Sequence, residues 1–372
     1  MTAAEGSPPE GHCAPGWEGV RDRLAESLDA GDDLGASVCA MVDGEAVVDV
    51  WGGYQDRAKT LPWTRDTICC VYSSGKAVLS ALVLRAVSEG ALDYDAPVSR
   101  TWPDFAAHGK DVTLAQAMSH QSGVVGFAEE VDPAIWLDWD RCCAALADEA
   151  PLWPPGTASG YGPQSFGYVV GEVLRRATGR TYGQHLRALR LGIHCGLSLS
   201  EATRAAPMAK PPRAPDLGVI DAPTRAAFLQ PWSSPSGVSR KDWAAAEIPA
   251  SNTHATARGL AEVMQGYAAG RVAGAAWAEE AAREAGWAER IAGPDKVLPF
   301  ELSWCAGLMR ETREGAFGGS PTAIGHYGFG GSCVMADPAT GLSFAYVPNK
   351  MSSVLVGDPR ARALLLAVRA AL

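Results

Sequence analysis

The sequence predicts an α+β protein, with an antiparallel sheet flanked by helices, built from both chain ends, and a mainly helical domain inserted in it. The first observation is where the strand-like runs lie, which is near the two ends of the chain, at 36–42, 46–51, 302–309, 326–336 and 342–347. The second is the helical periodicity that dominates between them. We therefore expect residues 16–80 and 300–372 to form the sheet domain and residues 81–299 to form the inserted domain.

Composition excludes several classes of partner. The chain has 372 residues, of which 47% are hydrophobic and 20% charged, as is ordinary for a globular enzyme with a large core. Its net charge of −10 argues against a nucleic-acid or anionic-membrane partner, because both require a basic surface. Residues 1–15 lack the pattern of a secretory signal, and no run approaches the ~18 apolar residues of a membrane span. The sequence leaves the oligomeric state open.

The nine cysteines favour a reducing compartment. They are odd in number, include the adjacent pairs Cys69-Cys70 and Cys142-Cys143, and form no Cys-x-x-Cys motif. This scatter is typical of buried, reduced thiols and not of a disulfide framework or a zinc site, so we expect a cytoplasmic protein. Phosphate-binding, zinc-protease and Gly-x-Ser-x-Gly motifs are also absent, and neither a metal nor an organic cofactor is implied.

The folded part is predicted to begin with a helix and a hairpin. Residues 16–30 place apolar side chains on one helical face. The strand-like runs 36–42 and 46–51 meet at Asp43-Gly44, a dipeptide typical of two-residue hairpin turns. Residues 1–15 are polar and rich in proline and glycine, so we expect them to be disordered.

The helix that opens at residue 73 is the most informative element for function. Apolar residues recur at three and four positions over 79–87, and Gly90 supplies a stop. Lys76 falls on the core-facing stripe, with Ser73 one turn earlier. Because burial lowers the pKa of a lysine, Lys76 could deprotonate a nucleophilic Ser73, and the helix N-terminus would favour an oxyanion. Alone, Ser-x-x-Lys is short enough to occur by chance, and Cys70 is a weaker rival nucleophile.

Three further helices of the inserted part have recognisable starts. Thr113 and Gln116 fit a capping box, and Thr256 is a suitable cap for a helix over 260–267. Asp132-Pro133 begins another helix in the preferred order of cap and then proline. These starts support the helical character predicted for the middle of the chain.

Tyr161 and the segment 205–250 are the candidate site features of the middle region. Tyr161 stands just ahead of an amphipathic helix over 166–177, a position where a tyrosine more often serves packing than catalysis. Residues 205–250 are rich in proline and serine and too long for a plain connector, so we expect a lid or substrate-lining segment.

The C-terminal part is predicted to return to strands. The runs 302–309 and 326–336 are followed by the turn 337–341, the strand 342–347 and a final helix over 358–372. His326 lies in the second of these runs, and a lone strand histidine is more often structural than catalytic. Together with Ser73-x-x-Lys76 and Tyr161, however, His326 completes a series of motifs whose order along the chain is specific.

Ser73-x-x-Lys76, Tyr161 and His326-Tyr327-Gly328 together resemble the serine β-lactamase and penicillin-binding-protein superfamily. The closest resemblance is to the class C β-lactamase-like esterases called family VIII carboxylesterases. It covers nearly the whole chain and includes Trp51-Gly52-Gly53, Ser119-His120-Gln121-Ser122-Gly123, Pro155-Gly156-Thr157 and Pro348-Asn349-Lys350-Met351. The resemblance implies a β-lactamase/transpeptidase-like fold, a small-molecule ester or acyl substrate, and no cofactor.

The resemblance also implies roles for individual residues. Ser73 would be acylated, Lys76 and Tyr161 would share the proton transfers, and the backbone N–H groups of Ser73 and Phe329 would form the oxyanion hole. His326 stands where β-lactamases usually have the lysine of Lys-Thr-Gly. Residues expected to contact the substrate are His326, Tyr327, Gly328, Asn252, His254, Gln121 and Trp232.

Two departures from the β-lactamase pattern favour an ester over a lactam. Tyr161 is followed by Gly162-Pro163, so the asparagine that would hold a lactam side chain is missing. His326 replaces a permanent cation by a group largely neutral at pH 7. We therefore predict a serine esterase that hydrolyses small carboxylic esters through an acyl-Ser73 intermediate. The alternatives are an acyltransferase to an alcohol or amine, then a β-lactamase or D-amino-acid peptidase, and last a non-catalytic binding protein.

Overall fold

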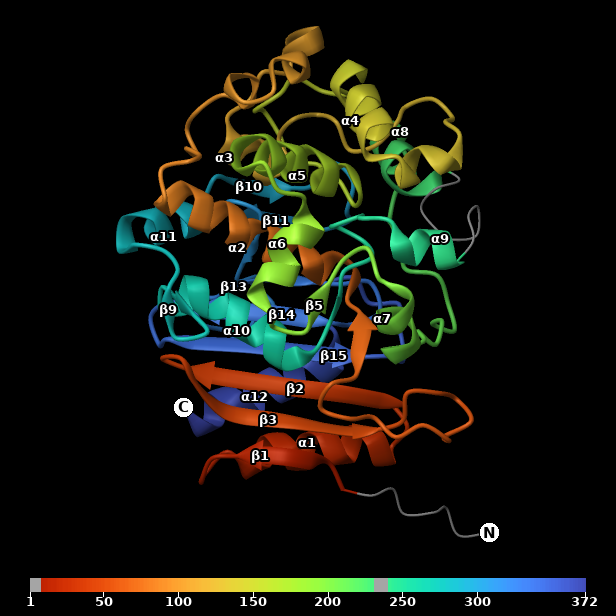
Figure 1. Cartoon of the computed structure of the whole chain (residues 1–372), viewed down its shortest axis with the longest axis vertical. Helices are drawn as coiled ribbons and strands as arrows, with labels where there is room; N and C mark the ends of the chain where they lie inside the picture. Colours follow the sequence, from red (N-terminus) through yellow and green to blue (C-terminus); the bar gives the residue numbers. More distant parts are fainter. Residues whose placement is uncertain (1–7, 231–239) are drawn as a thin grey trace.

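The structure, a computed structural model, describes residues 8–230 and 240–372. Within these residues the central element is a nine-stranded antiparallel sheet (Figure 1). In spatial order its strands are β1 (Glu10–Cys13), β3 (Glu45–Gly53), β2 (Gly35–Val42), β15 (Leu342–Pro348), β14 (Cys333–Asp337), β13 (Ile324–Tyr327), β12 (Met309–Arg310), β11 (Glu301–Trp304) and β10 (Ile291–Pro294). Because β2 pairs with β15, both chain ends contribute to one sheet, as predicted.

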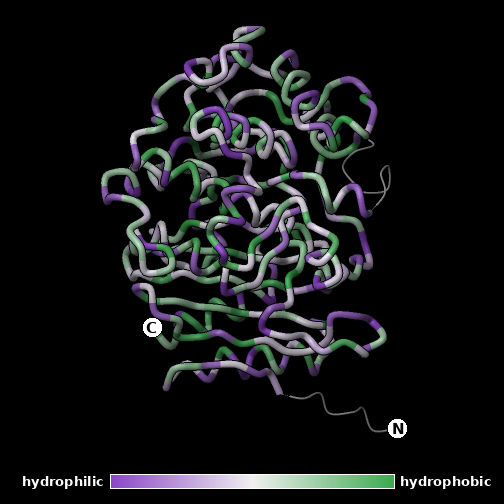
Figure 2. Tube along the Cα trace, in the orientation of Figure 1, coloured by the Kyte–Doolittle hydropathy of each residue, from purple (hydrophilic) through white to green (hydrophobic). Residues whose placement is uncertain are grey.

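Helices cover both faces of this sheet. They are α1 (Glu18–Asp29), α12 (Pro359–Ala371), α10 (Ala257–Ala268) and α2 (Gly75–Ser88). α1 packs against α12 on one side, whereas α10 contacts β2, β14 and β15 on the other and also packs against α2. Successive side chains of β2 enter different cores, Val38 on the α1 and α12 side and Cys39 on the α2 and α10 side. The strands are largely hydrophobic and the outer turns more hydrophilic (Figure 2).

Most of the other elements lie in the middle of the chain. The helices are α3 (Leu114–Met118), α4 (Trp139–Asp148), α5 (Ser165–Thr178), α6 (Tyr182–Leu189), α7 (Leu199–Arg204), α8 (Ala222–Thr224), α9 (Arg240–Ala245) and α11 (Glu280–Trp287). Short strands are β4 (Ile68–Cys70), β5 (Ile193–His194), β6 (Ala205–Ala206), β7 (His254–Ala255), β8 (Arg271–Val272) and β9 (Ala275–Ala276). No helix of the described ranges is long and apolar enough to cross a membrane. α2 packs against α5 as well as α10, so it lies between the sheet and the helical part (Figure 1).

Several local predictions are confirmed. Asp43 and Gly44 have φ of 50° and 89°, as a hairpin turn with two left-handed central residues requires. Thr113 and Gln116 form the predicted capping box, and the Thr256 side chain accepts from the third residue of its helix. Capping chemistry is encoded within three residues, which explains why the sequence revealed it.

Two predicted strands are each divided by a turn. The run 302–309 contains β11 and β12, with Gly307 at φ 85° between them. The run 326–336 contains β13 and β14, with Gly330 and Gly331 at φ 105° and 108° in the connecting turn. The sequence on both sides of each turn is strand-like, so the pattern alone did not reveal the breaks.

Three elements lie where the sequence predicted otherwise. β1 belongs to residues 1–15, which we expected to be disordered; its pairing with β3 orders a polar segment that has little strand character of its own. β10 falls in the range 81–299 and yet forms the other edge of the sheet. α10, in the same range, packs on the sheet. The division into a sheet domain (16–80 and 300–372) and an inserted domain (81–299) stays a prediction.

Candidate active site

Ser73 lies where a short strand turns into the central helix. β4, a 3₁₀ turn over Tyr72–Ser74 and α2 follow one another. Tyr72 has a φ of 45°, a left-handed conformation that costs a non-glycine residue on the order of 1–3 kcal/mol. The Ser74 N–H donates to Val71 O at 3.1 Å, so the Ser73 N–H precedes the first hydrogen bond of the turn. The turn thus leaves both the hydroxyl and the amide of Ser73 available for chemistry.

Lys76 is fully buried in the first turn of α2. Its Nζ lies 3.0 Å from Ser73 Oγ, 2.8 Å from Tyr161 Oη and 2.8 Å from Pro163 O. Burial lowers the pKa of Lys76 well below its ordinary value, and no charged neighbour within the described residues offsets this. Burial therefore favours the neutral amine of Lys76 over its ammonium form.

Ser73, Lys76 and Tyr161 form a closed ring of hydrogen bonds. Tyr161 Oη donates to Ser73 Oγ at 2.6 Å. In the ring, Lys76 Nζ donates to Tyr161 Oη across 2.8 Å and to Ser73 Oγ across 3.0 Å. Burial raises the pKa of Tyr161, so its phenol stays protonated. The ring thus brings a serine hydroxyl, a lysine amine and a protonated phenol into mutual contact.

Three consecutive backbone amides fix the position of Tyr161. The Gly160 N–H donates to His120 O at 3.0 Å, and the Gly162 N–H donates to His120 Nδ1 at 3.2 Å. Between them, the Tyr161 N–H donates to Asp295 Oδ1 at 2.9 Å. Because His120 Nδ1 accepts, the proton of this buried neutral imidazole resides on Nε2.

Asp295 is a positioning residue that the sequence did not reveal. Its Oδ1 also accepts from the N–H groups of Val297 and Leu298, both at 3.0 Å, in a turn built on the carboxylate. The local turn could have been predicted from an aspartate at this place. Its contact with Tyr161 spans 134 residues and leaves no local signal.

A cavity of about 420 Å³ opens beside the ring, lined by Ser73, Tyr161 and mostly apolar side chains. From the segment 205–250 it receives Ala214, Pro215, Leu217, Phe228 and Trp243, and from the later chain Leu298, Met309, Leu355 and Val356. None of the described residues that line it is an aspartate, glutamate, lysine or arginine. A larger hollow of about 710 Å³, lined in part by Trp102 and Arg175, lies among the helices and includes no residue of the ring.

The turn between β13 and β14 brings the Phe329 amide to this cavity. The Gly328 N–H donates to Ser332 O at 2.8 Å and the Gly331 N–H to Gly328 O at 3.0 Å, and these bonds leave the Phe329 N–H unused. Ser332 Oγ donates to Val71 O at 2.8 Å, and a Cβ on Gly328 would lie 2.1 Å from that oxygen. The turn is therefore packed directly against the chain that carries the nucleophile.

The sequence of this chain matches a known family. A family profile described as Beta-lactamase matches residues 20–369, which is most of the chain. The chain belongs to the beta-lactamase family. Esterase/beta-lactamase LipL of Mycobacterium tuberculosis is 30% identical over an alignment of 342 residues, gaps included, which covers 87% of this chain and 78% of that protein.

Solved structures of the beta-lactamase family share this fold. A penicillin-binding protein homologue from Caulobacter crescentus superposes with a TM-score of 0.94 and 44% identity, over 98% of this chain and 100% of that one. A family VIII carboxylesterase superposes with a TM-score of 0.91 and 35% identity, with the same coverage. The predicted fold and the resemblance to family VIII carboxylesterases are confirmed, and this member of the family is a serine hydrolase.

His326 and Tyr327 line the cavity of this beta-lactamase family member, with different roles for their side chains. His326 Nδ1 donates to Tyr327 O at 2.7 Å, which leaves Nε2 as an acceptor. Burial lowers the pKa of His326 to about 3, so the ring is neutral. The Tyr327 hydroxyl donates to Ala316 O at 2.5 Å and its ring packs on Phe317, so this side chain belongs to the core.

Four predicted substrate contacts need correction, because their groups are used elsewhere. The Asn252 side chain is fully buried and donates to Trp243 O at 2.6 Å and Ala246 O at 2.8 Å. His254 Nδ1 bonds Asn252 O at 2.7 Å, and Gln121 Nε2 donates to Ser119 Oγ at 2.7 Å; neither residue lines the cavity. The Gly328 amide is occupied within its turn. Trp232 lies outside the described residues.

Gln164 and Ser251 supply polar groups to the cavity that the sequence did not assign. Ser251 Oγ donates to Gln164 Oε1, which fixes the amide at the wall. Gln164 is the third residue after Tyr161, one place away from the asparagine position of β-lactamases, so spacing alone argued against it. Tertiary folding nevertheless brings it to the site.

Proposed function

We propose that this chain hydrolyses small, uncharged carboxylic esters through an acyl-Ser73 intermediate. The closed ring of Ser73, Lys76 and Tyr161, all in neutral form, carries the proposal. A neutral lysine beside a serine hydroxyl is a competent base, and a protonated tyrosine on the same oxygen is a competent acid. The similarity to an esterase and to a family VIII carboxylesterase supports the choice of substrate.

Acylation follows from the contacts of the ring. Ser73 Oγ attacks the ester carbonyl carbon while its proton passes to the lone pair of Lys76 Nζ. The N–H groups of Ser73 and Phe329 hold the tetrahedral oxyanion. The intermediate collapses, Tyr161 gives its proton to the departing alkoxide, and the Lys76 ammonium returns a proton to Tyr161 across their 2.8 Å contact. The products are an alcohol, acyl-Ser73 and a neutral ring.

Deacylation reverses these proton movements with water as the nucleophile. Water attacks the acyl carbonyl carbon and its proton passes to the Lys76 and Tyr161 pair. The carbon–oxygen bond to Ser73 then breaks, and the same pair returns a proton to Ser73 Oγ. The carboxylic acid leaves and the ring is restored.

The cavity lining favours an uncharged substrate. Its described wall has no ionised side chain, and His326 is neutral where β-lactamases have a cation. A lactam or D-amino-acid peptide with a free carboxylate would lose hydration without gaining a counterion. Small apolar acyl and alcohol groups bury against Phe228, Leu298 and Met309 at no such cost.

Acyl transfer to an added alcohol is a second candidate, favoured by the same apolar wall. Phe228 and Trp243 stand where they can shelter acyl-Ser73 from water and bind an apolar acceptor. Turnover in the presence of a small alcohol distinguishes the two outcomes. A hydrolase yields mainly free acid, whereas a transferase yields mainly the new ester.

Intact-protein mass spectrometry with p-nitrophenyl butyrate tests the mechanism. We expect a transient butyryl adduct and nitrophenol release in the wild type, and neither in Ser73→Ala. Ser74→Ala is the matched control, because Ser74 Oγ bonds Ser332 Oγ at 3.0 Å and takes no part in the ring. An adduct that persists in Ser73→Ala would contradict the assignment.

We also infer a cytoplasmic location, as the cysteine pattern predicted. None of the nine cysteines, which all lie in the described residues, forms a disulfide, and all except Cys13 are buried. Burial raises the pKa of several of these thiols, Cys39 and Cys333 among them, so they remain protonated and unreactive.

A further inference from the structure

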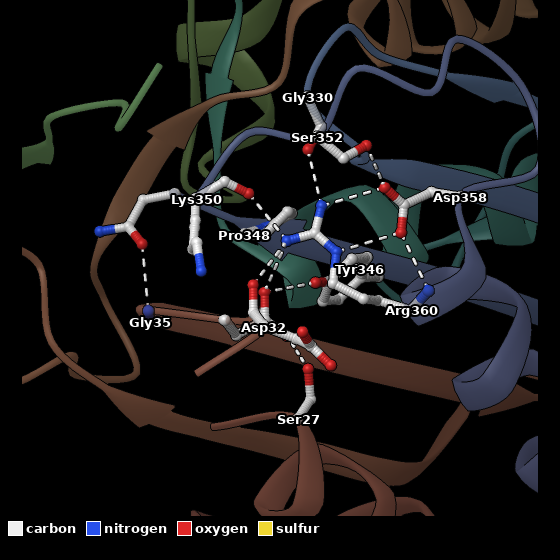
Figure 3. Close-up of polar contacts among 12 residues, drawn as sticks. Ser27, Asp32, Gly35, Gly330, Tyr346, Pro348, Lys350, Ser352, Asp358 and Arg360 are labelled. Carbon is white, nitrogen blue, oxygen red and sulfur yellow. Dashed lines mark hydrogen bonds and ion pairs between the residues drawn. The ribbon is translucent and has the colours of Figure 1, made fainter. Parts of the chain in front are cut away.

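Arg360, at the start of α12, joins segments that lie far apart in the sequence (Figure 3). Its guanidinium donates to both carboxylate oxygens of Asp358, at 3.1 and 3.0 Å, and to Asp33 Oδ1 at 3.0 Å. The Arg360 side chain is 11% exposed and the two carboxylates are fully buried. The remaining donors reach backbone carbonyls, namely Lys350 O at 2.8 Å and Gly330 O at 2.9 Å.

The contact with Gly330 O connects this cluster to the active site. Gly330 O and the Gly331 N–H belong to one peptide group, and that N–H donates to Gly328 O at 3.0 Å. Gly328 O and the Phe329 N–H belong to a second peptide group. Because peptide groups are planar, fixing Gly330 O restrains both planes and hence the direction of the Phe329 N–H.

The turn needs such an external anchor. Gly330 and Gly331 have φ of 105° and 108°, a region that side chains rarely adopt, and glycine populates many other conformations as readily. Local backbone preference therefore does little to select this geometry. The Ser352 N–H donates to Gly330 O at 3.1 Å beside Arg360, and Ser352 Oγ donates to Asp358 Oδ2 at 2.5 Å. The carbonyl is thus held by two donors of one connected cluster.

We propose that Arg360 is a positioning residue for the oxyanion hole, acting through Gly330 O on the Phe329 N–H. The inference rests on the proposed acyl-Ser73 chemistry. Removing Arg360 from Gly330 O weakens oxyanion binding without touching the nucleophile or its base.

The far side of the same cluster supplies a matched control. Asp33 accepts from Tyr346 Oη at 2.6 Å and from Ser27 Oγ at 2.7 Å. Ser27 belongs to α1 and not to the turn. Ser27→Ala therefore removes a hydrogen bond of the cluster and leaves the Arg360 contact with Gly330 O in place. A role limited to stability predicts similar behaviour for Ser27→Ala and an Arg360 variant. A positioning role predicts that only the Arg360 variant changes oxyanion binding.

The experiment compares wild type, Arg360→Lys and Ser27→Ala in full-length protein. Arg360→Lys keeps a charge but lacks the fork that reaches both carboxylates and Gly330 O. We expect kcat for p-nitrophenyl butyrate to fall about ten- to hundredfold with KM little changed. Affinity for butylboronic acid, whose tetrahedral adduct on Ser73 places an oxygen in the oxyanion hole, should fall by a similar factor. Ser27→Ala should keep both values near wild type while lowering Tm.

A second readout does not depend on turnover. Hydrogen exchange of the turn 328–332 should be faster in Arg360→Lys than in Ser27→Ala, even if the wild type cleaves no ester. Slow exchange and wild-type boronate affinity in folded Arg360→Lys would overturn the inference. If that variant does not fold, the neutral triple variant Arg360→Met, Asp33→Asn, Asp358→Asn replaces it, since replacing a whole buried ion cluster is better tolerated than breaking it. Unchanged exchange in the triple variant also overturns the inference.

Discussion

Lys76 and Arg360 are both buried basic side chains, and their surroundings differ in one respect. Within the described residues no carboxylate pairs with Lys76, so burial lowers its pKa and favours the neutral amine. Burial also opposes the charge of Arg360, but Tyr346, Asp358 and Asp33 raise its pKa above the ordinary value. Burial therefore favours an uncharged amine at Lys76, whereas the carboxylates maintain a cation at Arg360.

The difference agrees with the two roles that we propose, a base for Lys76 and a positioning residue for Arg360. A lysine deprived of a counterion is costly to bury as a cation, and the fold avoids that cost by keeping it neutral, which is the state a base requires. An arginine held by two carboxylates has no free lone pair and serves geometry only. His326 follows the pattern of Lys76, since it too is buried without a carboxylate and its pKa falls to about 3.

Replacing Lys76 by a residue that cannot act as a neutral base should produce the largest loss of activity. Lys76→Arg places a cation that cannot lose its proton among Ser73, Tyr161 and Pro163 O, so we expect kcat to fall by about 10³–10⁴-fold and Tm to fall as well. Lys76→Met should lose activity to the same extent but keep a higher Tm than Lys76→Arg. Steady-state kinetics and thermal unfolding of both variants test this. Appreciable turnover by Lys76→Arg would show that the base need not be neutral.

Tyr161→Phe should have a smaller effect that depends on the leaving group. Without the phenol, an alkoxide must leave unprotonated, and we expect about a 10²-fold loss of kcat for an alkyl butyrate. p-Nitrophenolate leaves without a proton, so p-nitrophenyl butyrate should be affected less. Tyr327→Phe is the control, because its hydroxyl bonds Ala316 O in the core. Equal losses for both esters would argue against Tyr161 as the acid.

His326 should make the protein less stable in acid. Its pKa is about 3 in the folded state against 6.5 in an unperturbed chain, so below pH 6.5 the unfolded state binds the extra proton. The free energy of unfolding should fall by up to about 1.4 kcal/mol per pH unit from pH 6.5 toward pH 3. His326→Gln should flatten this slope in urea unfolding at several pH values. An unchanged slope would mean that other groups dominate.

The sequence predicted what depends on near neighbours and missed what depends on distant ones. The spacing of Ser73 and Lys76, the capping box at Thr113 and the Asp43-Gly44 hairpin are each encoded within a few residues. Arg360 and Asp33 are 327 residues apart in the sequence, and no local sequence pattern near either residue predicts their contact. The order of the motifs along the chain made up for part of this missing long-range information. It grouped Ser73, Lys76 and Tyr161 before any contact among them was known.

Asp295 should give the smallest effect and the finest distinction between charge and geometry. Asp295→Asn retains an oxygen that can accept from the Tyr161 N–H, so we expect kcat to change only a few-fold, whereas Asp295→Ala should cost about tenfold. The negative charge also raises the pKa of Tyr161, so Asp295→Asn should shift the alkaline limb of the kcat profile to lower pH. A large loss in Asp295→Asn would mean that the charge itself matters. The Asp295 carboxylate would then influence the reaction through its charge, in addition to holding the Tyr161 loop in place. Lys76, by contrast, has no carboxylate partner within the described residues.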